Sequence, residues 1–237
     1  SQRISSIEAD LFYKNGKLLI GHDLEDLRED ATFEDMYVLP LVKLFHQNGG
    51  KAWKDSNETL TLVVELKSKT EPTLSAVVKL LQKYPKVFDS SKNPNAVKIV
   101  VTGNVPEGID FEKYPEFIMF DGTFQNYKSE ELKRIAMISV PFFDYANWNG
   151  KGAMTAPQKM KVQKAIDEAH KLGKPIRFWA SPDGITAWNT LHQMGVDIIN
   201  TDKVEACTDY FSNFIDKNYY IDGTKHLGMQ GVRGTYS

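Results

Sequence analysis

Short apolar runs rich in β-branched residues alternate along the whole chain with longer stretches in which apolar residues recur at helical spacing. Runs of the first kind are typical of strands, and the second kind favours amphipathic helices. We predict seven strands, at residues 6–12, 62–66, 98–102, 117–120, 136–140, 176–180 and 197–200. We predict helices between them, at residues 32–47 (interrupted by Pro40), 73–84, 129–134, 157–172, 184–194 and 203–215.

Local signals support several of the predicted helix ends. Thr32 followed by Asp35 has the spacing of a capping box, in which the two side chains satisfy free backbone donors at a helix start. Gly173 and Gly195 stand where two helices should end, and glycine is favoured there because it adopts positive φ without strain.

The alternation of strands and helices predicts an α/β fold with a parallel sheet. The runs around Val63 and Val100 carry few charges, as expected for strands covered on both faces. The number of units and the chain length of 237 residues favour a TIM-type (β/α)8 barrel. A doubly wound open sheet is the alternative, although no glycine-rich phosphate loop opens any predicted helix.

The strand count falls one short of a complete barrel, which has eight strand–helix units. We therefore expect that this chain lacks its first βα unit, or that another segment fills the gap. We assign residues 1–216 to a single barrel domain and residues 217–237 to a C-terminal tail. The tail is aromatic and then glycine-rich, which favours an extended arm over a helix.

The composition is that of an ordinary globular protein, with 41% hydrophobic and 25% charged residues. A net charge of −2 gives no reason to expect nucleic acid as a partner, and no apolar run is long enough for a transmembrane helix. The single cysteine, Cys207, excludes an intrachain disulfide and a cysteine-rich metal site. The compartment stays open, because an exported protein whose N-terminal region is absent here would have the same features.

Acidic residues stand at two places where buried strands are predicted to end. Glu8 and Asp10 share one face of the first strand, and Glu65 and Lys67 share one face of the next. Like charges on a buried face repel and lose hydration unless a cation lies between them. We therefore predict that Glu8, Asp10 and Glu65 hold one divalent cation, Mg²⁺ or Ca²⁺, and that Lys67 offers positive charge to an anionic substrate. The alternative is a pair of ordinary ion pairs at a solvated edge.

His22 follows an expected tight turn at Asn15-Gly16, which would return the chain to the neighbourhood of Asp10. A histidine at that place could act as a general acid or base near neutral pH. The alternative is a structural or capping histidine. Because His46, His170 and His192 lie in helical patterns, we expect them to be non-catalytic.

Three further residues are candidates for substrate binding at the same end of the sheet. Arg177 and Trp179 share a strand face, so Arg177 could bind a phosphate oxygen and Trp179 could wall the pocket or simply fill the barrel. Asp121 ends another strand, where it could accept a substrate hydroxyl or serve only as a turn residue. We expect Asn200 and Asp202 to cap the last helix.

The chain resembles the glycerophosphodiester phosphodiesterase superfamily, which includes the phosphatidylinositol-phospholipase-C-like barrels. The motifs that carry the resemblance occur in family order: Glu8-Ala9-Asp10, Gly21-His22-Asp23, Glu65-Leu66-Lys67 and Gly195-Val196-Asp197-Ile198-Ile199-Asn200-Thr201-Asp202. The resemblance implies a TIM barrel, one divalent ion held by Glu8, Asp10 and Glu65, a catalytic role for His22, and contact between Lys67 and the phosphate. The family's other catalytic histidine comes from the first strand, and nothing before Glu8 matches its motif.

The absence of a first βα unit would explain both the missing histidine and the missing strand. Alternatively, His226 could supply the second histidine from the tail. We predict a metal-dependent phosphoric diester hydrolase that acts as a monomer on a small glycerophosphodiester or phosphoinositol-type substrate. A non-catalytic barrel that binds a phosphorylated or sugar ligand is the main alternative. A barrel aldolase or isomerase using Lys67 is a third, but it leaves Glu8 and Asp10 without a role.

Overall fold

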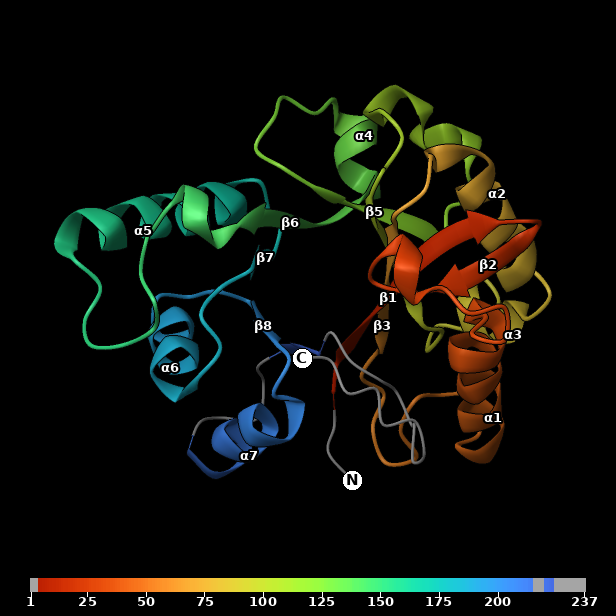
Figure 1. Cartoon of the computed structure of the whole chain (residues 1–237), viewed down its shortest axis with the longest axis horizontal. Helices are drawn as coiled ribbons and strands as arrows, with labels where there is room; N and C mark the ends of the chain where they lie inside the picture. The colour runs from red at the N-terminus through yellow and green to blue at the C-terminus, as the bar shows by residue number, and fades with distance from the viewer. Residues whose placement is uncertain (1–3, 215–219, 224–237) are drawn as a thin grey trace.

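One nine-stranded sheet forms the centre of the molecule, in a computed structural model that describes residues 4–214 and 220–223 (Figure 1). Hydrogen bonds join its strands in the order β2-β1-β3-β4-β5-β6-β7-β8-β9. The bounds are Ser6–Lys14 (β1), Lys17–Ile20 (β2), Thr61–Leu66 (β3), Lys98–Gly103 (β4), Ile118–Gly122 (β5), Ile135–Pro141 (β6), Ile176–Trp179 (β7), Ile198–Thr201 (β8) and Tyr220–Gly223 (β9). All seven predicted strands are confirmed, and their ends agree within two residues.

The sheet is parallel except for β2, which returns from β1 as an antiparallel hairpin. The expected tight turn is present, with φ of 52° at Asn15 and 78° at Gly16. From β3 to β8 each strand lies beside the next one along the chain. A doubly wound sheet would reverse the strand order at one point, so the described strands do not fit that alternative. The sheet curls (Figure 1), and the fold is an α/β fold of the TIM-like kind.

The strand β9 lies in the segment that the sequence assigned to an extended tail. It pairs in parallel with β8, where Asn200 is opposite Asp222, and with β1, where Ser6 is opposite Asp222 and Ile7 is opposite Gly223. Four residues of the predicted arm are therefore extended and belong to the sheet. His226 lies outside the described residues, and the absence of a first βα unit stays a prediction.

Helices cover the outer face of the sheet. In Figure 1, α1 to α3 lie at the right of the view and α5 and α6 at the left. Their bounds are Leu39–Gln47 (α1), Thr70–Leu81 (α2), Pro85–Phe88 (α3), Ser129–Arg134 (α4), Ala156–Lys171 (α5), Ile185–Gln193 (α6) and Val204–Phe214 (α7). The prediction for residues 32–47 was wrong in one respect, because a π-helical turn (Glu34–Val38) precedes α1. Pro40 lies in the first turn of α1, where its missing N–H is tolerated.

The predicted glycine signals are present, and the Thr32–Asp35 signal is present in part, because the Asp35 carboxylate accepts from the Thr32 hydroxyl and not from a backbone N–H. The Thr32 hydroxyl donates to Asp35 Oδ2 over 2.6 Å, and the Asp35 N–H donates to Thr32 Oγ1 over 3.1 Å. Gly173 and Gly195 follow the ends of α5 and α6 with φ of 68° and 92°. These interactions join residues only a few positions apart, at places where capping side chains and glycines with positive φ are favoured.

Two apolar clusters lie on the two faces of the sheet. The larger one packs the helices against the outer face and includes fully buried Phe33 and Trp188. The smaller one, on the inner face, consists of Val63, Val100, Ala136 and Met137, with Met119 and Ile198 packed against it. Because side chains alternate along a strand, Val63 lies one repeat below Glu65 on the same face. The inner face is therefore apolar at this level and polar nearer the carboxyl ends of the strands.

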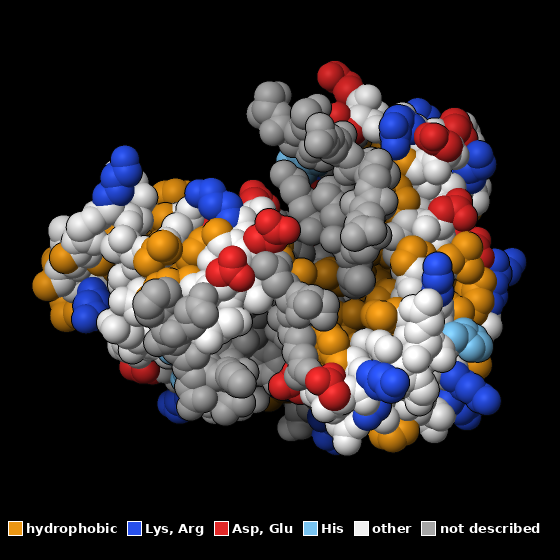
Figure 2. Space-filling view, turned by 90° about the horizontal axis from the view of Figure 1, so that it is seen from below, with side chains coloured by type: hydrophobic (Ala, Val, Ile, Leu, Met, Phe, Trp, Pro, Cys, Tyr) orange, Lys and Arg blue, Asp and Glu red, His pale blue; other side chains and the backbone are white. Residues whose placement is uncertain are grey.

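The surface seen in Figure 2 carries acidic and basic side chains interspersed among apolar ones. No single sign of charge dominates this face, in agreement with the net charge of −2. Within residues 4–214 and 220–223, no helix combines the length and hydropathy needed to cross a bilayer.

Candidate active site at the carboxyl ends of the strands

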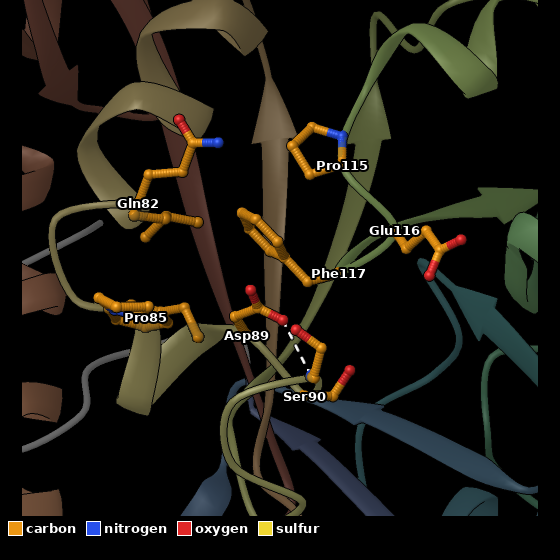
Figure 3. A pocket seen from close by; sticks show the side chains of 10 residues that line it. Gln82, Pro85, Asp89, Ser90, Pro115, Glu116 and Phe117 are labelled. Carbon is orange, nitrogen blue, oxygen red and sulfur yellow. Dashed lines mark hydrogen bonds between the residues drawn. The ribbon is translucent and has the colours of Figure 1, made fainter.

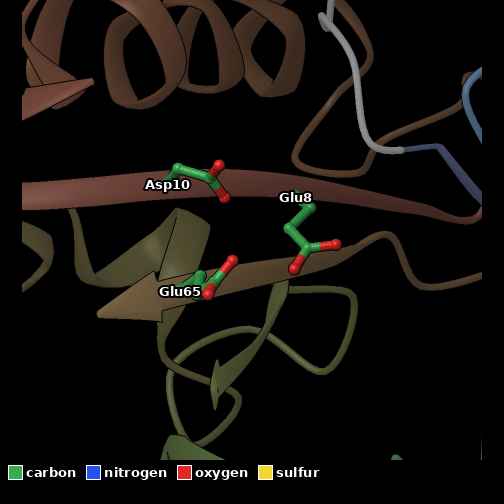
Figure 4. A group of neighbouring side chains, drawn as sticks. All are labelled: Glu8, Asp10 and Glu65. Atoms are coloured by element: carbon green, nitrogen blue, oxygen red, sulfur yellow. The ribbon is translucent and has the colours of Figure 1, made fainter. Parts of the chain in front are cut away.

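Two adjacent strands bring three carboxylates together on the inner face of the sheet (Figure 4). Asp10 of β1 is the register partner of Glu65 of β3, and Glu8 precedes Asp10 by one strand repeat. One oxygen of each side chain lies within 4.8 Å of the corresponding oxygens of the other two. The structure places the three predicted ligands side by side, and ion binding by them stays a prediction.

Lys67 supplies positive charge to the upper pair of carboxylates. Its Nζ lies 2.9 Å from Glu65 Oε1 and 3.8 Å from Asp10 Oδ2. Burial acts to lower the pKa of Lys67, but the hydrogen bond to Glu65 and the charges of Asp10 and Glu8 outweigh it, so this pKa lies above its ordinary value. Lys67 therefore stays protonated and can attract an anion.

Glu65 holds its charge less readily than an exposed carboxylate. Burial is the largest influence and raises its pKa, the hydrogen bond from Lys67 lowers it, and the negative charge of Asp10 raises it again. The net direction is upward. Lys67 alone thus only partly offsets the charges of Glu65 and Asp10, and a hard divalent cation with oxygen ligands would neutralise the excess.

Glu8 has a different partner, supplied from the opposite part of the chain. Arg177 Nη2 of β7 donates to Glu8 Oε2 over 2.5 Å, and the two side chains are only 4% and 9% exposed. Arg177 also donates to Asn200 Oδ1 of β8, from Nε over 3.0 Å and from Nη2 over 2.6 Å. The guanidinium group therefore joins β1, β7 and β8 across the inner face. Phosphate binding by Arg177 stays a prediction.

Sequence reasoning missed the contacts of two neighbouring residues of β8, the first of which is Asn200. We expected it to cap the last helix, but it accepts hydrogen bonds from Arg177 instead. The available signal was the same one that identified Glu65, a polar side chain near the carboxyl end of an apolar strand. Its neighbour Thr201 was also missed, and its hydroxyl donates to Asp183 over 2.5 Å.

Asp121 occupies the next part of the same inner face, at the end of β5. Its Oδ2 accepts a hydrogen bond from the Thr102 hydroxyl of β4 over 2.6 Å. Burial raises the pKa of Asp121 to about 6, while the bond from Thr102 and the charge of Arg177 act in the opposite direction. Above this pKa the carboxylate is ionised and can accept a further hydrogen bond, and acceptance from a substrate hydroxyl stays a prediction.

His22 reaches the site from the loop after β2. The Gly21 N–H donates to the Asp10 carbonyl over 3.3 Å, and this bond returns the loop to the level of Asp10. His22 Nδ1 then lies 3.2 Å from Asp10 Oδ2, while 71% of its side chain stays exposed. Proton exchange between the other ring nitrogen, Nε2, and a ligand stays a prediction. The predicted approach of His22 to Asp10 is present.

Trp179 lies at the rim, one strand repeat beyond Arg177 on the same face. It is 45% exposed, so it does not fill the interior of the sheet as the alternative interpretation required. The predicted site residues therefore occupy one end of the molecule, with charged groups below and an aromatic group at the edge. Their individual roles stay predictions.

A separate cavity of about 290 Å³ lies at the opposite end of β5 (Figure 3). It opens between α3 and the segment that precedes β5, and Pro85, Asp89 and Phe117 are among its lining residues. Because Ile118 begins β5, Phe117 marks the amino end of that strand. This cavity is therefore distinct from the carboxylate site.

The chain is similar to two protein families and to a named fungal protein. Residues 2–121, half of the chain, match the family model described as AIM6-like phosphodiesterase domain. Residues 175–205 match the glycerophosphoryl diester phosphodiesterase family. The chain is also 23% identical over 233 residues to a protein of Arthroderma benhamiae named altered inheritance of mitochondria protein 6 homolog, an alignment that covers 87% of this chain and 74% of the relative. The first match contains Glu8, Asp10, His22, Glu65 and Lys67, and the second contains Arg177 and Asn200.

Proposed function

The chain belongs to the AIM6-like phosphodiesterase domain family, within the glycerophosphodiester-phosphodiesterase-like superfamily, and from this premise we propose that it is a metal-dependent phosphoric diester hydrolase. We propose glycerophosphodiester or phosphoinositol-type compounds as its substrates. We also propose that the sheet closes as a TIM-type barrel, with β9 filling the gap between β8 and β1, and the pairing of β9 with both strands supports this.

The observation that carries the proposal is the approach of Glu8, Asp10 and Glu65 to within 4.8 Å of one another. An all-oxygen set of carboxylates suits Mg²⁺ or Ca²⁺. When bound there, such an ion supplies Lewis-acid charge stabilisation to a phosphoryl group. In this proposal Lys67, whose Nζ lies close to Glu65 and Asp10, binds a second oxygen of the same group.

Proton transfer falls to His22 in this proposal. Asp10 contacts the imidazole at Nδ1, and Nε2 protonates the leaving oxygen or accepts a proton from the attacking hydroxyl. Asp121 accepts a hydrogen bond from a substrate hydroxyl. The family resemblance suggests attack by a neighbouring hydroxyl of the substrate through a cyclic phosphate, followed by hydrolysis.

A second candidate function is supported by the positions of the other described histidines. His46, His170 and His192 lie on α1, α5 and α6, outside the sheet. Among the residues that the structure describes, none of them can therefore act with His22 at the carboxylates. A barrel that binds a phosphorylated ligand and a cation without turnover is compatible with the same geometry.

Ion binding is tested by calorimetry with Mg²⁺ and Ca²⁺. We expect Glu65→Gln to abolish detectable binding, because it removes one of three charged ligands while leaving the fold intact. Glu130→Gln, on exposed α4, is the matched control and should bind as the wild type does. Unchanged affinity in Glu65→Gln would remove Glu65 from the ligand set.

Turnover is tested with bis-p-nitrophenyl phosphate and with a glycerophosphodiester in the presence of each ion. His22→Ala should keep ion binding and lose turnover by about a hundredfold or more, the usual contribution of a general acid or base. His46→Ala, on the exposed surface of α1, is the control. Wild-type ion binding without any turnover would favour the binding function over the hydrolase.

A further inference from the structure

A serine of β6 carries a buried hydroxyl that no other group of the protein satisfies. Ser139 is 4% exposed, and its Oγ has no hydrogen-bond partner within the part of the chain that the structure describes. Buried polar groups in proteins are nearly always paired, because an unpaired one has lost its hydration without compensation. Packing alone therefore does not explain a serine at this position.

Strand pairing places Ser139 among the charged groups of the candidate site. Ser139 is the register partner of Arg177 on β7, so the two residues lie at the same level of the same face. Its chain neighbours, Ile138 and Val140, belong to the apolar cluster on the outer face, so the Ser139 side chain points to the inner face. Arg177 contacts Glu8, one of the predicted ion ligands. The unpaired hydroxyl is thus at the level of the Arg177–Glu8 pair.

Asp121 of β5 lies on the other side of Ser139. Met137, one strand repeat below Ser139 on the inner face, is the register partner of Asp121. Burial raises the pKa of Asp121 and the charge of Arg177 acts in the opposite direction, so these two groups influence each other across β6. Ser139 is on this intervening strand, and its hydroxyl therefore lies between an acidic and a basic neighbour.

The hydrogen-bonding capacity of this part of the inner face suits a hydroxyl group. Arg177 already donates to Glu8 and Asn200. Asp121 accepts from Thr102 through Oδ2 and, when ionised, has lone pairs for further donors. The Ser139 hydroxyl supplies a donor beside this acceptor. A ligand hydroxyl, which both accepts and donates, is complementary to such a pair.

We propose that Ser139 binds the substrate directly: its hydroxyl donates to the oxygen of a substrate hydroxyl, and that substrate hydroxyl donates its own proton to Asp121. Ser139 lies one strand repeat, about 7 Å, below Pro141 at the end of β6, within reach of a ligand that enters from the carboxyl ends of the strands. This inference rests on the proposed function, because it takes the carboxylate site as the place of the phosphoryl group. Ser139 then determines specificity, since a ligand without the hydroxyl leaves a buried polar group unpaired.

Binding is tested by calorimetry on the full chain with Mg²⁺ present, using glycerol 3-phosphate and propyl phosphate. The two probes share a three-carbon chain, and only the first carries hydroxyl groups. The wild type should bind glycerol 3-phosphate more tightly. Ser139→Ala should weaken that binding about three- to tenfold, the contribution of one hydrogen bond, and leave the affinity for propyl phosphate unchanged. Ser90→Ala, at an exposed serine beside the separate cavity, is the matched control and should bind both probes as the wild type does.

Two outcomes of this titration would overturn the proposal. In the first, the wild type binds glycerol 3-phosphate no more tightly than propyl phosphate. In the second, Ser139→Ala weakens both probes equally, which would assign Ser139 to the phosphoryl group. A double-mutant cycle with Asp121→Asn tests the shared hydroxyl. The two losses should be less than additive, and full additivity would place the two side chains on different groups of the ligand.

Thermal unfolding of the ligand-free protein in EDTA gives an independent result. Ser139→Ala removes an unpaired buried hydroxyl, so its Tm should be at least that of the wild type and up to about 4 °C higher. Ser68→Ala removes the acceptor of the Tyr13 N–H and should lower the Tm. A Tm of Ser139→Ala as low as that of Ser68→Ala, or loss of folding, would show a structural role for the hydroxyl and contradict the proposal.

Failure of this inference and failure of the hydrolase are distinguishable, because neither measurement requires turnover. Turnover of bis-p-nitrophenyl phosphate together with equal affinities for the two probes contradicts hydroxyl recognition alone. A selective loss of glycerol 3-phosphate binding in Ser139→Ala, without turnover of any diester by the wild type, supports the role of Ser139 and contradicts the hydrolase.

Discussion

The ion pair between Arg177 and Glu8 provides the sharpest test of the structure. Its two side chains are 4% and 9% exposed, and Nη2 lies 2.5 Å from Oε2. Replacing Arg177 by Met keeps a long, unbranched side chain and removes the charge. Glu8 would then be a buried carboxylate without its guanidinium partner, and Asn200 would lose two hydrogen bonds.

The size of the effect follows from the burial of the pair. Removing one partner of a buried ion pair costs about 3–5 kcal/mol, most of it from the uncompensated charge that is left behind. For a chain of 237 residues this corresponds to a fall in Tm of about 6–20 °C. The double variant Glu8→Gln/Arg177→Met removes both charges, so it should recover a large part of the loss.

The assay is urea unfolding of the wild type, Arg177→Met and the double variant, each with EDTA and with saturating Ca²⁺. If Glu8 is an ion ligand, Ca²⁺ supplies the charge that Arg177 no longer provides, so it should stabilise Arg177→Met more than the wild type. At a free concentration of a hundred times its Kd, a ligand stabilises the folded state by about 2.7 kcal/mol. A loss below about 1 kcal/mol in Arg177→Met, or a double variant as unstable as the single one, would refute the reasoning.

Two further predictions concern stability. Burial raises the pKa of Asp121 to about 6 from its ordinary 3.8. The folded protein therefore binds this proton more tightly than the unfolded chain, and the free energy of unfolding of the wild type should fall as the pH rises between these values. At about 1.4 kcal/mol per pH unit the whole change is about 3 kcal/mol, which is an upper bound because the side chain is partly accessible. Asp121→Asn lacks this titration. In urea unfolding, the free energy of unfolding of Asp121→Asn minus that of the wild type should therefore be larger at pH 8 than at pH 4. An equal difference at both pH values would contradict the assignment. Gly150→Ala should lower stability by at least 1 kcal/mol more than Gly152→Ala. Both glycines have positive φ, but only at Gly150 would the new Cβ meet Pro182, and equal losses in thermal unfolding would show that this contact yields.

Much of the fold was predictable because its signals are local. The seven strands follow from short apolar runs, and the helix starts and ends at Thr32, Gly173 and Gly195 follow from side-chain and backbone chemistry within a few residues. Strand alternation alone also predicts that Glu8 and Asp10 share one face. The π-helical turn at Glu34–Val38 was not predictable, since its spacing satisfies the same apolar pattern as an α-helix.

The candidate site was predictable only in part, because local signals identify its residues but not all of the contacts between distant strands. The sequence identified polar residues that end apolar strands, and Asp10, Glu65, Lys67 and His22 come together because β1, β3 and the β2 hairpin are neighbours in space. It gave no indication that Asn200 would accept hydrogen bonds from Arg177.

The sequence by itself determined which residues form strands and helices, and which side chains share a face. Only the tertiary structure decided that Arg177 lies against Glu8, 169 positions away, and that Tyr220–Gly223 pairs with both β8 and β1. The period of a strand is set by its own backbone, whereas contacts across the inner face depend on the register and curvature accumulated over every intervening strand. A local pattern can therefore predict that a charge faces inward, but the partner of that charge is decided by the folding of the whole sheet.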